Sequence, residues 1–126
     1  MRYLTVGEVL EVNALVMGGR HLLRDMGLLE SAVARPQASA FGADAYPDLV
    51  SKAAALLHSL VLNHAFVDGN KRTAVLATVV FLDLNGCVVS WDQGDALDFI
   101  LRLADHQVGL SEVAAFLRER THSRNR

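Results

Sequence analysis

The residues of this chain that are best suited to chemistry lie together between His64 and Arg72, in the order His-Ala-Phe-Val-Asp-Gly-Asn-Lys-Arg. An imidazole can accept a proton near neutral pH, and a carboxylate such as that of Asp68 is a ligand that Mg²⁺ prefers. Arginine offers a planar fork of donors to phosphate oxygens, and lysine adds a mobile point charge. This combination of residue types predicts a site that handles phosphate groups.

Two apolar segments with helical character flank this stretch, residues 56–62 before it and residues 74–82 after it. Gly69 and Asn70 tolerate unusual backbone angles, so we expect the second helix to begin near Asn70. The first backbone N–H groups of a helix lack partners within it and carry partial positive charge. The glycine also allows a ligand to approach this backbone closely.

Lys71 and Arg72 place two further positive charges in the first turn of that helix. Cations at this end oppose the helix dipole, so a bound anion explains them better than helix stability does. Phosphate is the usual anion at helix N-termini. We therefore expect a phosphate site formed by Gly69, Asn70, Lys71 and Arg72.

His64 follows Leu60 and Val61 at the spacing of one helix face, so it extends an apolar stripe at the point where the helix gives way to the turn. We expect a half-buried imidazole that takes a proton from a hydroxyl attacking the phosphate. Asp68 is expected to hold Mg²⁺, which keeps several waters when it also binds phosphate oxygens. Phe66 is expected to anchor the turn in the core.

The stretch from His64 to Arg72 resembles the signature of the Fic/Doc superfamily. Fic enzymes carry His-Pro-Phe-x-(Asp/Glu)-Gly-Asn-Gly-Arg-x-x-Arg, and the Doc branch, the death-on-curing toxins, has lysine where Fic has its second glycine. This chain has Lys71 at that position. It also has Ala65 in place of the proline, and Val75 in place of the last arginine, so the phosphate contact of that arginine is missing. The two larger differences favour the Doc branch over an AMP-transferring Fic enzyme.

The resemblance extends over nearly the whole chain, through residues 3–5, 27–32, 34–37 and 46–47. It implies the all-helical toxin of a type II toxin–antitoxin pair, which uses Mg²⁺ and moves the γ-phosphoryl of ATP to a threonine hydroxyl of elongation factor Tu, blocking translation. It also implies a small Phd-like antitoxin whose C-terminal segment folds into a groove of the toxin. The roles implied are general base for His64, magnesium ligand for Asp68, and phosphate cradle for Gly69, Asn70, Lys71 and Arg72.

Two other functions remain open from the sequence. One is protein adenylyl transfer, with the same base and the opposite orientation of the nucleotide. The other is a binding module that keeps the motif without catalysis. A zinc site through His58, His64 and Asp68 is disfavoured because the spacing matches no known ligand pattern. We expect His58 to be a hydrogen-bonded core histidine, and Trp91 with Asp92 to form a core edge and helix cap rather than a nucleotide-stacking site.

Length and composition indicate one domain, residues 1–126, with a single core. Hydrophobic residues make up 52% and charged residues 21%, which is a globular balance. The net charge of −2 gives no general reason to bind nucleic acid. Cys87 is the lone cysteine, which excludes an internal disulfide and fits a reducing cytosol. Without a signal-peptide core or an apolar run long enough to span a membrane, the chain is expected to be cytoplasmic.

The pattern of caps, breaks and apolar spacing predicts an all-α, Fic/Doc-like bundle of about six helices around a buried central helix. We expect the helix over residues 70–85 to be the central one, because it is apolar on nearly every side. Residues 38–46 are expected to form a loop, either a flap that aligns the target or an ordinary connector. Residues 20–26 form either a pocket rim or a solvated loop, and residues 118–126 are expected to be an unstructured tail.

Overall fold

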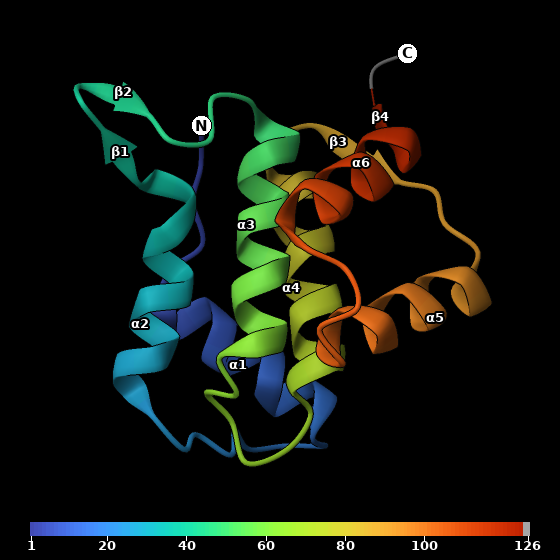
Figure 1. Ribbon diagram of the computed structural model, residues 1–126. Coiled ribbons are helices and arrows are strands. Elements are labelled where there is room, and N and C mark those ends of the chain that lie inside the picture. The colour runs from blue at the N-terminus through green and yellow to red at the C-terminus, as the bar shows by residue number, and fades with distance from the viewer. Residues whose placement is uncertain (125–126) are drawn as a thin grey trace.

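A computed structural model describes residues 1–124 and shows a bundle of six helices, which confirms the all-α expectation (Figure 1). The helices are α1 (Val6–Val16), α2 (Met26–Ala34), α3 (Leu49–Leu62), α4 (Asn70–Leu84), α5 (Gln93–Ala104) and α6 (Leu110–Arg120). A short 3₁₀ helix, η1 (Arg35–Gln37), follows α2. Two small antiparallel pairs complete the fold: β1 (Ser39–Ala40) with β2 (Ala43–Asp44), and β3 (Cys87–Val89) with β4 (Thr121–Ser123).

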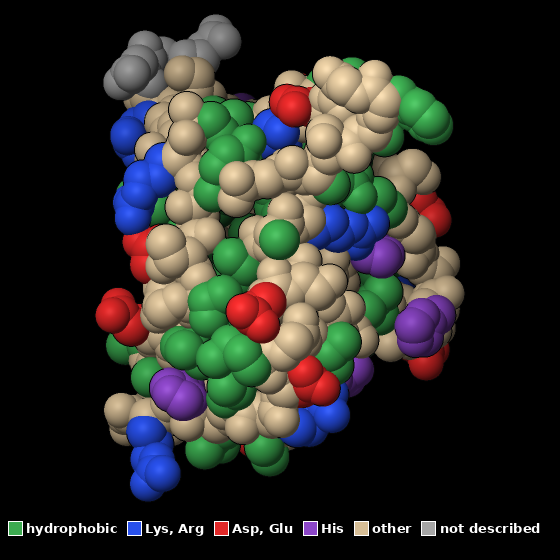
Figure 2. Space-filling model, turned by 90° about the vertical axis from the view of Figure 1, so that its left-hand side faces the viewer, with side chains coloured by type: hydrophobic (Ala, Val, Ile, Leu, Met, Phe, Trp, Pro, Cys, Tyr) green, Lys and Arg blue, Asp and Glu red, His purple; other side chains and the backbone are tan. Residues whose placement is uncertain are grey.

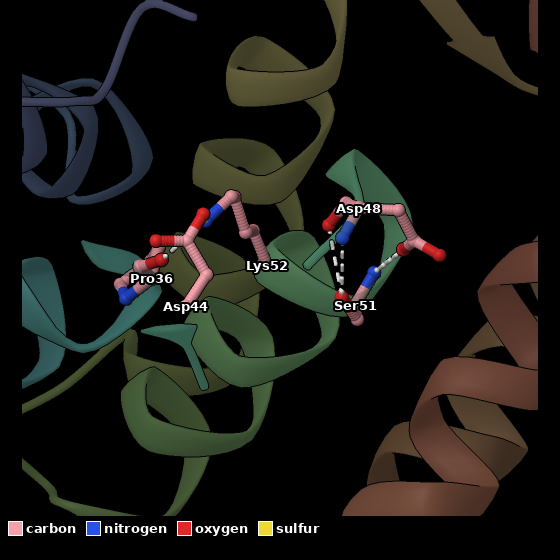
Figure 3. A network of polar contacts seen from close by, with 5 residues as sticks. All are labelled: Pro36, Asp44, Asp48, Ser51 and Lys52. Carbon is pink, nitrogen blue, oxygen red and sulfur yellow. Dashed lines mark hydrogen bonds and ion pairs between the residues drawn. The ribbon is translucent and has the colours of Figure 1, made fainter. Parts of the chain in front are cut away.

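Side-chain caps begin several helices where the sequence contains Asp or Thr. Thr5 and Glu8 form the expected capping box of α1, and Asp92 caps α5 as expected. Figure 3 shows the corresponding box of α3, in which Asp48 accepts from the backbone N–H of Ser51 at 2.8 Å. This hydrogen bond, aided by Arg118, lowers the pKa of the Asp48 carboxyl. The carboxylate therefore stays ionised at the positive end of the helix.

The buried central helix is α3, and the expectation that residues 70–85 would fill this role was wrong. α3 packs against α2, α4, α5, α6 and η1, and most of its side chains are buried. Its small residues 53–55 are fully buried and let neighbouring helices approach closely. α4 lies behind α3 in Figure 1 and buries only one side, formed by Thr73, Ala74, Ala77, Thr78, Phe81 and Leu82.

The C-terminal segment is more ordered than expected. Arg118–Arg120 end α6, and Thr121–Ser123 then pair with Cys87–Val89 as a strand. The N–H of Arg124 donates to the carbonyl of Gly86 at 2.8 Å, which extends this contact. Residues 121–124 are thereby fixed to the segment after α4. The remaining part of the expected tail, residues 125–126, lies outside the described residues.

The two ends of α3 carry different parts of the molecule. The connection from α3 to α4, residues 63–69, lies at the lower end of the bundle in Figure 1, whereas the β1–β2 hairpin lies at the upper end. α3 has 14 residues, so about 20 Å of helix separates these ends. The loop expected at residues 38–46 is therefore a hairpin, and its position at the far end contradicts its proposed role as a flap over the site.

The surface carries charges of both signs. Figure 2 shows the side of the molecule with α2 and the hairpin, where acidic and basic side chains are interspersed with hydrophobic ones. This distribution agrees with the small net charge of −2. None of the helices within residues 1–124 is long and apolar enough to cross a membrane.

Candidate active site

A single surface hollow of about 400 Å³ contains all six residues that the sequence singles out for chemistry. It lies at the start of α4, beside the connection that follows α3. Its lining residues are His64, Val67, Asp68, Gly69, Asn70, Lys71, Arg72 and Leu97. The structure thus brings together the imidazole, the carboxylate and the two cations, and adds Leu97 from α5.

The start of α4 leaves backbone donors free, as expected for an anion site. Gly69 is the N-cap with φ +76° and provides no side-chain cap, and Asn70 is the first helical residue. The first hydrogen bond of the helix runs from the N–H of Thr73 to the carbonyl of Gly69 at 2.8 Å. The N–H groups of residues 70–72 therefore have no partner within the helix.

Lys71 and Arg72 are exposed at this helix start, and no acidic residue in the described part of the chain forms an ion pair with either. Within residues 1–124, the Arg72 side chain makes one long polar contact, 4.0 Å from Nη2 to Sδ of Met17. Unpaired cations beside free N–H groups form an electropositive pocket. This arrangement can bind an oxyanion such as a phosphate group.

Gly69 is required by packing as well as by its backbone angle. A Cβ at this position would lie 2.6 Å from Sδ of Met17, 3.3 Å from Cγ1 of Val16 and 3.4 Å from Nδ2 of Asn13. The turn thus presses directly against the end of α1. The sequence suggested only that the glycine opens the backbone to a ligand, and contact with α1 is a second reason for it.

The side chain of Asn70 braces the turn rather than facing a ligand. Its Oδ1 accepts from the N–H of Phe66 at 3.0 Å, and its Nδ2 donates to the carbonyl of Phe66 at 2.8 Å. Phe66 is 2% exposed, which confirms its expected role as an anchor. Asn70 is therefore left with its backbone N–H as the group that can contact a phosphate.

Asn13, on α1, supports the site from behind, and sequence reasoning did not identify it. It is fully buried, and its Nδ2 donates to the carbonyl of Asp68 at 3.2 Å and to Oγ1 of Thr73 at 3.0 Å. Its Oδ1 accepts from the N–H of Leu22 at 2.9 Å. One amide thus ties together three segments around the hollow. A polar residue within the apolar face of a helix was the available signal.

His64 is exposed, so the expectation of a half-buried imidazole was wrong. α3 ends at Leu62, and His64 has φ +51°, a left-handed conformation that is uncommon outside glycine. Position 64 is therefore off the helix and does not continue its apolar stripe. The turn instead places the side chain at the edge of the hollow.

The connection between α1 and α2 packs against the turn that carries the candidate site, but none of residues 20–26 lines the hollow, which gives no support to the pocket-rim alternative. Leu23 and Phe66 form an antiparallel bridge, and the N–H of Val67 donates to the carbonyl of Leu22 at 2.7 Å. The N–H groups of Arg24 and Asp25 both donate to the carbonyl of Ala65, at 2.8 and 3.0 Å. These bonds hold the active-site turn, residues 63–69, against the connection between α1 and α2.

The carboxylate of Asp68 is exposed, and its Oδ1 accepts from the N–H of Gly69 at 2.7 Å. Within residues 1–124, no three His, Cys, Asp or Glu side chains are grouped closely enough to hold a metal ion. The disfavoured zinc site through His58, His64 and Asp68 is therefore not assembled. A single carboxylate does fit Mg²⁺ bound together with substrate phosphates, because that ion takes most of its ligands from phosphate and water.

A second, apolar groove of about 300 Å³ continues from the hollow between α4 and α5. Lys71, Arg72 and Leu97 line both. The remaining lining comes from Val75, Leu76, Val79, Trp91, Gln93, Ala96 and Ile100. Trp91 also packs against Phe116, with ring centroids 6.3 Å apart, so it lies at the edge of the core as expected.

Comparisons with known proteins match nearly the whole chain, including the segment that forms this hollow. The model of the Fic/DOC family matches residues 3–82, which include the whole stretch from His64 to Arg72. The chain is 48% identical over 117 residues to the protein named Toxin Doc of Mycolicibacterium smegmatis (strain ATCC 700084 / mc(2)155), covering 91% of this chain and 90% of that protein. It is 31% identical over 121 residues to the protein named Protein kinase doc of Escherichia phage P1, covering 94% of each.

Proposed function

Because this chain belongs to the Fic/DOC family, we propose that it is the toxin of a type II toxin–antitoxin pair and acts as a Doc-like protein kinase. It transfers the γ-phosphoryl group of ATP to a threonine hydroxyl of elongation factor Tu and so blocks translation. The observation that carries this proposal is the single hollow that joins His64, Asp68 and the cationic start of α4. The name of the phage P1 relative supports phosphoryl transfer as the reaction.

The chemistry of the step follows from these groups. His64 takes the proton of the target hydroxyl, the hydroxyl oxygen bonds to the γ-phosphorus, and the bond from that phosphorus to the β–γ bridging oxygen breaks, which releases ADP. Lys71, Arg72 and the N–H groups of residues 70–72 stabilise charge on the phosphate oxygens. The backbone donors are oriented before the reaction because they belong to the first turn of α4.

Asp68 would hold the magnesium ion of Mg-ATP, which neutralises phosphate charge when it is bound. One oxygen of this carboxylate accepts from the N–H of Gly69, which holds the group beside the start of α4, and Asp68 lines the hollow. Exposure of the side chain leaves room for the waters that Mg²⁺ retains. The donor set therefore fits the ion.

The decisive experiment incubates the purified chain and elongation factor Tu with ATP labelled on either the γ- or the α-phosphate. We expect γ-label on the target, no α-label, and loss of transfer in His64→Ala. His106→Ala is the matched control, because His106 is also exposed and has φ +60° but lies in the connection after α5, away from the hollow. Lys71→Ala should reduce transfer by about tenfold or more, the loss expected for a charge-assisted contact to phosphate.

The same experiment separates the alternatives. Transfer of α-label would establish adenylyl transfer and overturn the kinase proposal. Absence of either label, together with growth arrest by the His64→Ala variant in cells, would favour a non-catalytic binding module. Val75 argues against adenylyl transfer, since it provides no cation where Fic enzymes have an arginine.

The proposed partner that inhibits the toxin is a small Phd-like antitoxin. The apolar groove between α4 and α5 can take an amphipathic helix, and Leu97 and Leu101 of α5 are 57% and 47% exposed beside it. An antitoxin gene beside the toxin gene, and co-purification of its product, would support this pairing. Leu97→Asp should weaken co-purification, and unchanged binding would place the antitoxin elsewhere.

A further inference from the structure

The guanidinium group of Arg24 reaches from the α1–α2 connection to the end of α3, where the active-site turn begins. Its Nε donates to the carbonyl of His64 at 2.8 Å, and its Nη2 donates to the same oxygen. The same Nη2 lies 3.5 Å from the carbonyl of Asn63. The last carbonyls of a helix have no partners within it and carry partial negative charge, so a cation is favourable there.

The residue that Arg24 holds is strained and has little other support. His64 has φ +51°, which is unfavourable for a residue with a Cβ. Its imidazole makes no hydrogen bond to any residue in the described part of the chain, so its direction depends on its backbone. Strained conformations persist at functional sites when the surroundings fix them.

Other contacts hold the neighbours of His64 but leave its own carbonyl to Arg24. Nδ2 of Asn63 donates to the carbonyl of Leu28 at 3.1 Å. The backbone N–H groups of Arg24 and Asp25 donate to the carbonyl of Ala65. None of these bonds uses the Arg24 side chain, so we expect a substitution there to release His64 without detaching the whole turn.

We propose that Arg24 is a positioning residue, which fixes the backbone of His64 and so aims the imidazole at the target hydroxyl. The inference rests on the proposed function, because it assigns Arg24 to the same proton transfer. Arg24 acts through the carbonyl of His64 and does not itself bind the nucleotide.

The test compares Arg24→Gln, Arg24→Lys and Arg20→Gln with the wild-type chain. Arg20 is an exposed arginine on the same connection, and its side chain forms no hydrogen bond or ion pair with a described residue, so Arg20→Gln removes the same charge without the carbonyl bond. We expect Arg24→Gln to lower kcat by about tenfold or more while KM for ATP changes by less than about twofold. Arg24→Lys should recover part of the rate, since lysine can donate one bond to the carbonyl. Arg20→Gln should match wild type.

Three outcomes would overturn the proposal. One is unchanged kcat in Arg24→Gln. The second is a raised KM for ATP with kcat retained, which would mean that Arg24 binds the nucleotide. The third is an equal loss of kcat in Arg20→Gln, which would show that the rate depends on the positive charge of this connection and not on the bond to the His64 carbonyl.

A second readout does not depend on turnover. The NMR signals of the His64 ring should broaden or split in Arg24→Gln, because the ring then samples several orientations, and should stay sharp in Arg20→Gln. If the wild-type chain proved inactive, the proposed function would fail, but this comparison would still decide whether Arg24 fixes His64.

Discussion

Gly69 shows how one residue can combine a backbone requirement with a packing requirement. Its φ of +76° disfavours any side chain, and a Cβ would meet Met17 at 2.6 Å. Gly86, at the other end of α4, has φ +85° but open space around its Cβ position. The two glycines therefore separate the cost of the angle from the cost of the contact.

We expect Gly69→Ala to destabilise the fold by about 2–3 kcal/mol and Gly86→Ala by about 1 kcal/mol, since strain alone costs about the latter amount. Urea unfolding monitored by circular dichroism gives both values. Because the Met17 side chain is flexible, Met17→Ala in the Gly69→Ala background should restore part of the difference. Equal losses in the two single variants would show that contact with α1 contributes nothing.

His58 is hydrogen-bonded, as expected, but it is half-buried rather than part of the buried core. Nη1 of Arg35 lies 2.9 Å from its Nδ1, and a ring nitrogen that accepts from a guanidinium carries no proton. Partial burial, followed by the positive charges of Arg35 and His106, lowers the pKa of His58 from its ordinary 6.5. The folded protein therefore binds this proton at lower pH than the unfolded chain does.

The sign of this difference predicts how stability depends on pH. The stability that comes from neutral His58 is complete above pH 6.5. It falls as the pH drops from there toward the lowered pKa of His58, because the unfolded chain binds the proton first. We expect His58→Gln, whose side-chain oxygen can still accept from Arg35, to lose less stability than wild type between about pH 7.5 and about pH 5. His21→Gln is the exposed control and should follow wild type. Parallel curves for all three proteins would contradict the assignment.

Residue types were the most predictable part of the site, and their surroundings the least. His64, Asp68, Lys71 and Arg72 were identified because few structural reasons place such groups together at a helix start. The exposure of His64 could not be predicted, since it depends on the backbone angle of that residue. The helix ends at Leu62, close to the expected end near Asn63, but the left-handed angle of His64 then takes the residue off the apolar stripe of the helix.

At the scale of elements, α1 supports the site through Asn13. Its amide satisfies three groups on the two connections and on α4, all in a buried position. Removing one partner of a buried hydrogen bond leaves the others unsatisfied, which costs more than the bond itself contributes. The start of α4 therefore depends on a helix far away in the sequence.

We expect Asn13→Ala to lower stability by about 2–4 kcal/mol and also to reduce transfer, because the turn that holds Asp68 loses its brace. Asn85→Ala is a suitable control. Asn85 also bonds three backbone groups, of Arg2 and Phe81, but at the opposite end of α4. It should lose stability with activity per folded molecule unchanged. Full activity of folded Asn13→Ala would restrict Asn13 to a structural role.

Elements with caps were predictable because their signals are local. Thr5, Asp48 and Asp92 begin helices through bonds to residues three positions later, and a sequence shows such spacing directly. The β1–β2 and β3–β4 pairs could not be predicted in this way, since two- and three-residue strands are too short for an alternating pattern. The central position of α3 was also not predicted. Both α3 and α4 are rich in apolar residues, and the sequence alone did not show which of the two helices is covered on more sides.

At the scale of the whole molecule, the fold separates the hairpin from the site. The hairpin is attached at the upper end of α3 in Figure 1 through Lys52, whose buried Nζ donates to the carbonyl of Pro36 at 3.2 Å and lies 3.4 Å from Asp44 (Figure 3). The tip carries Phe41, which is fully exposed with φ +54°. The hairpin tip and His64 lie at opposite ends of α3, so the tip can affect the reaction only if a bound target protein contacts both ends.

We therefore expect exchange of residues 40–43 for glycine and serine to leave kcat, and KM for the target protein, within about twofold of wild type. Asp44 and Lys52 are retained, so the loss of stability should stay below about 1 kcal/mol. The matched control is the same exchange in residues 20–23, beside the active-site turn. That exchange removes the Leu23 side chain next to Phe66 and should reduce transfer by about tenfold or more. If the hairpin exchange lowered transfer as strongly while the protein stayed folded, the target would have to reach both ends of α3, and the separation of hairpin and site would not hold in the complex.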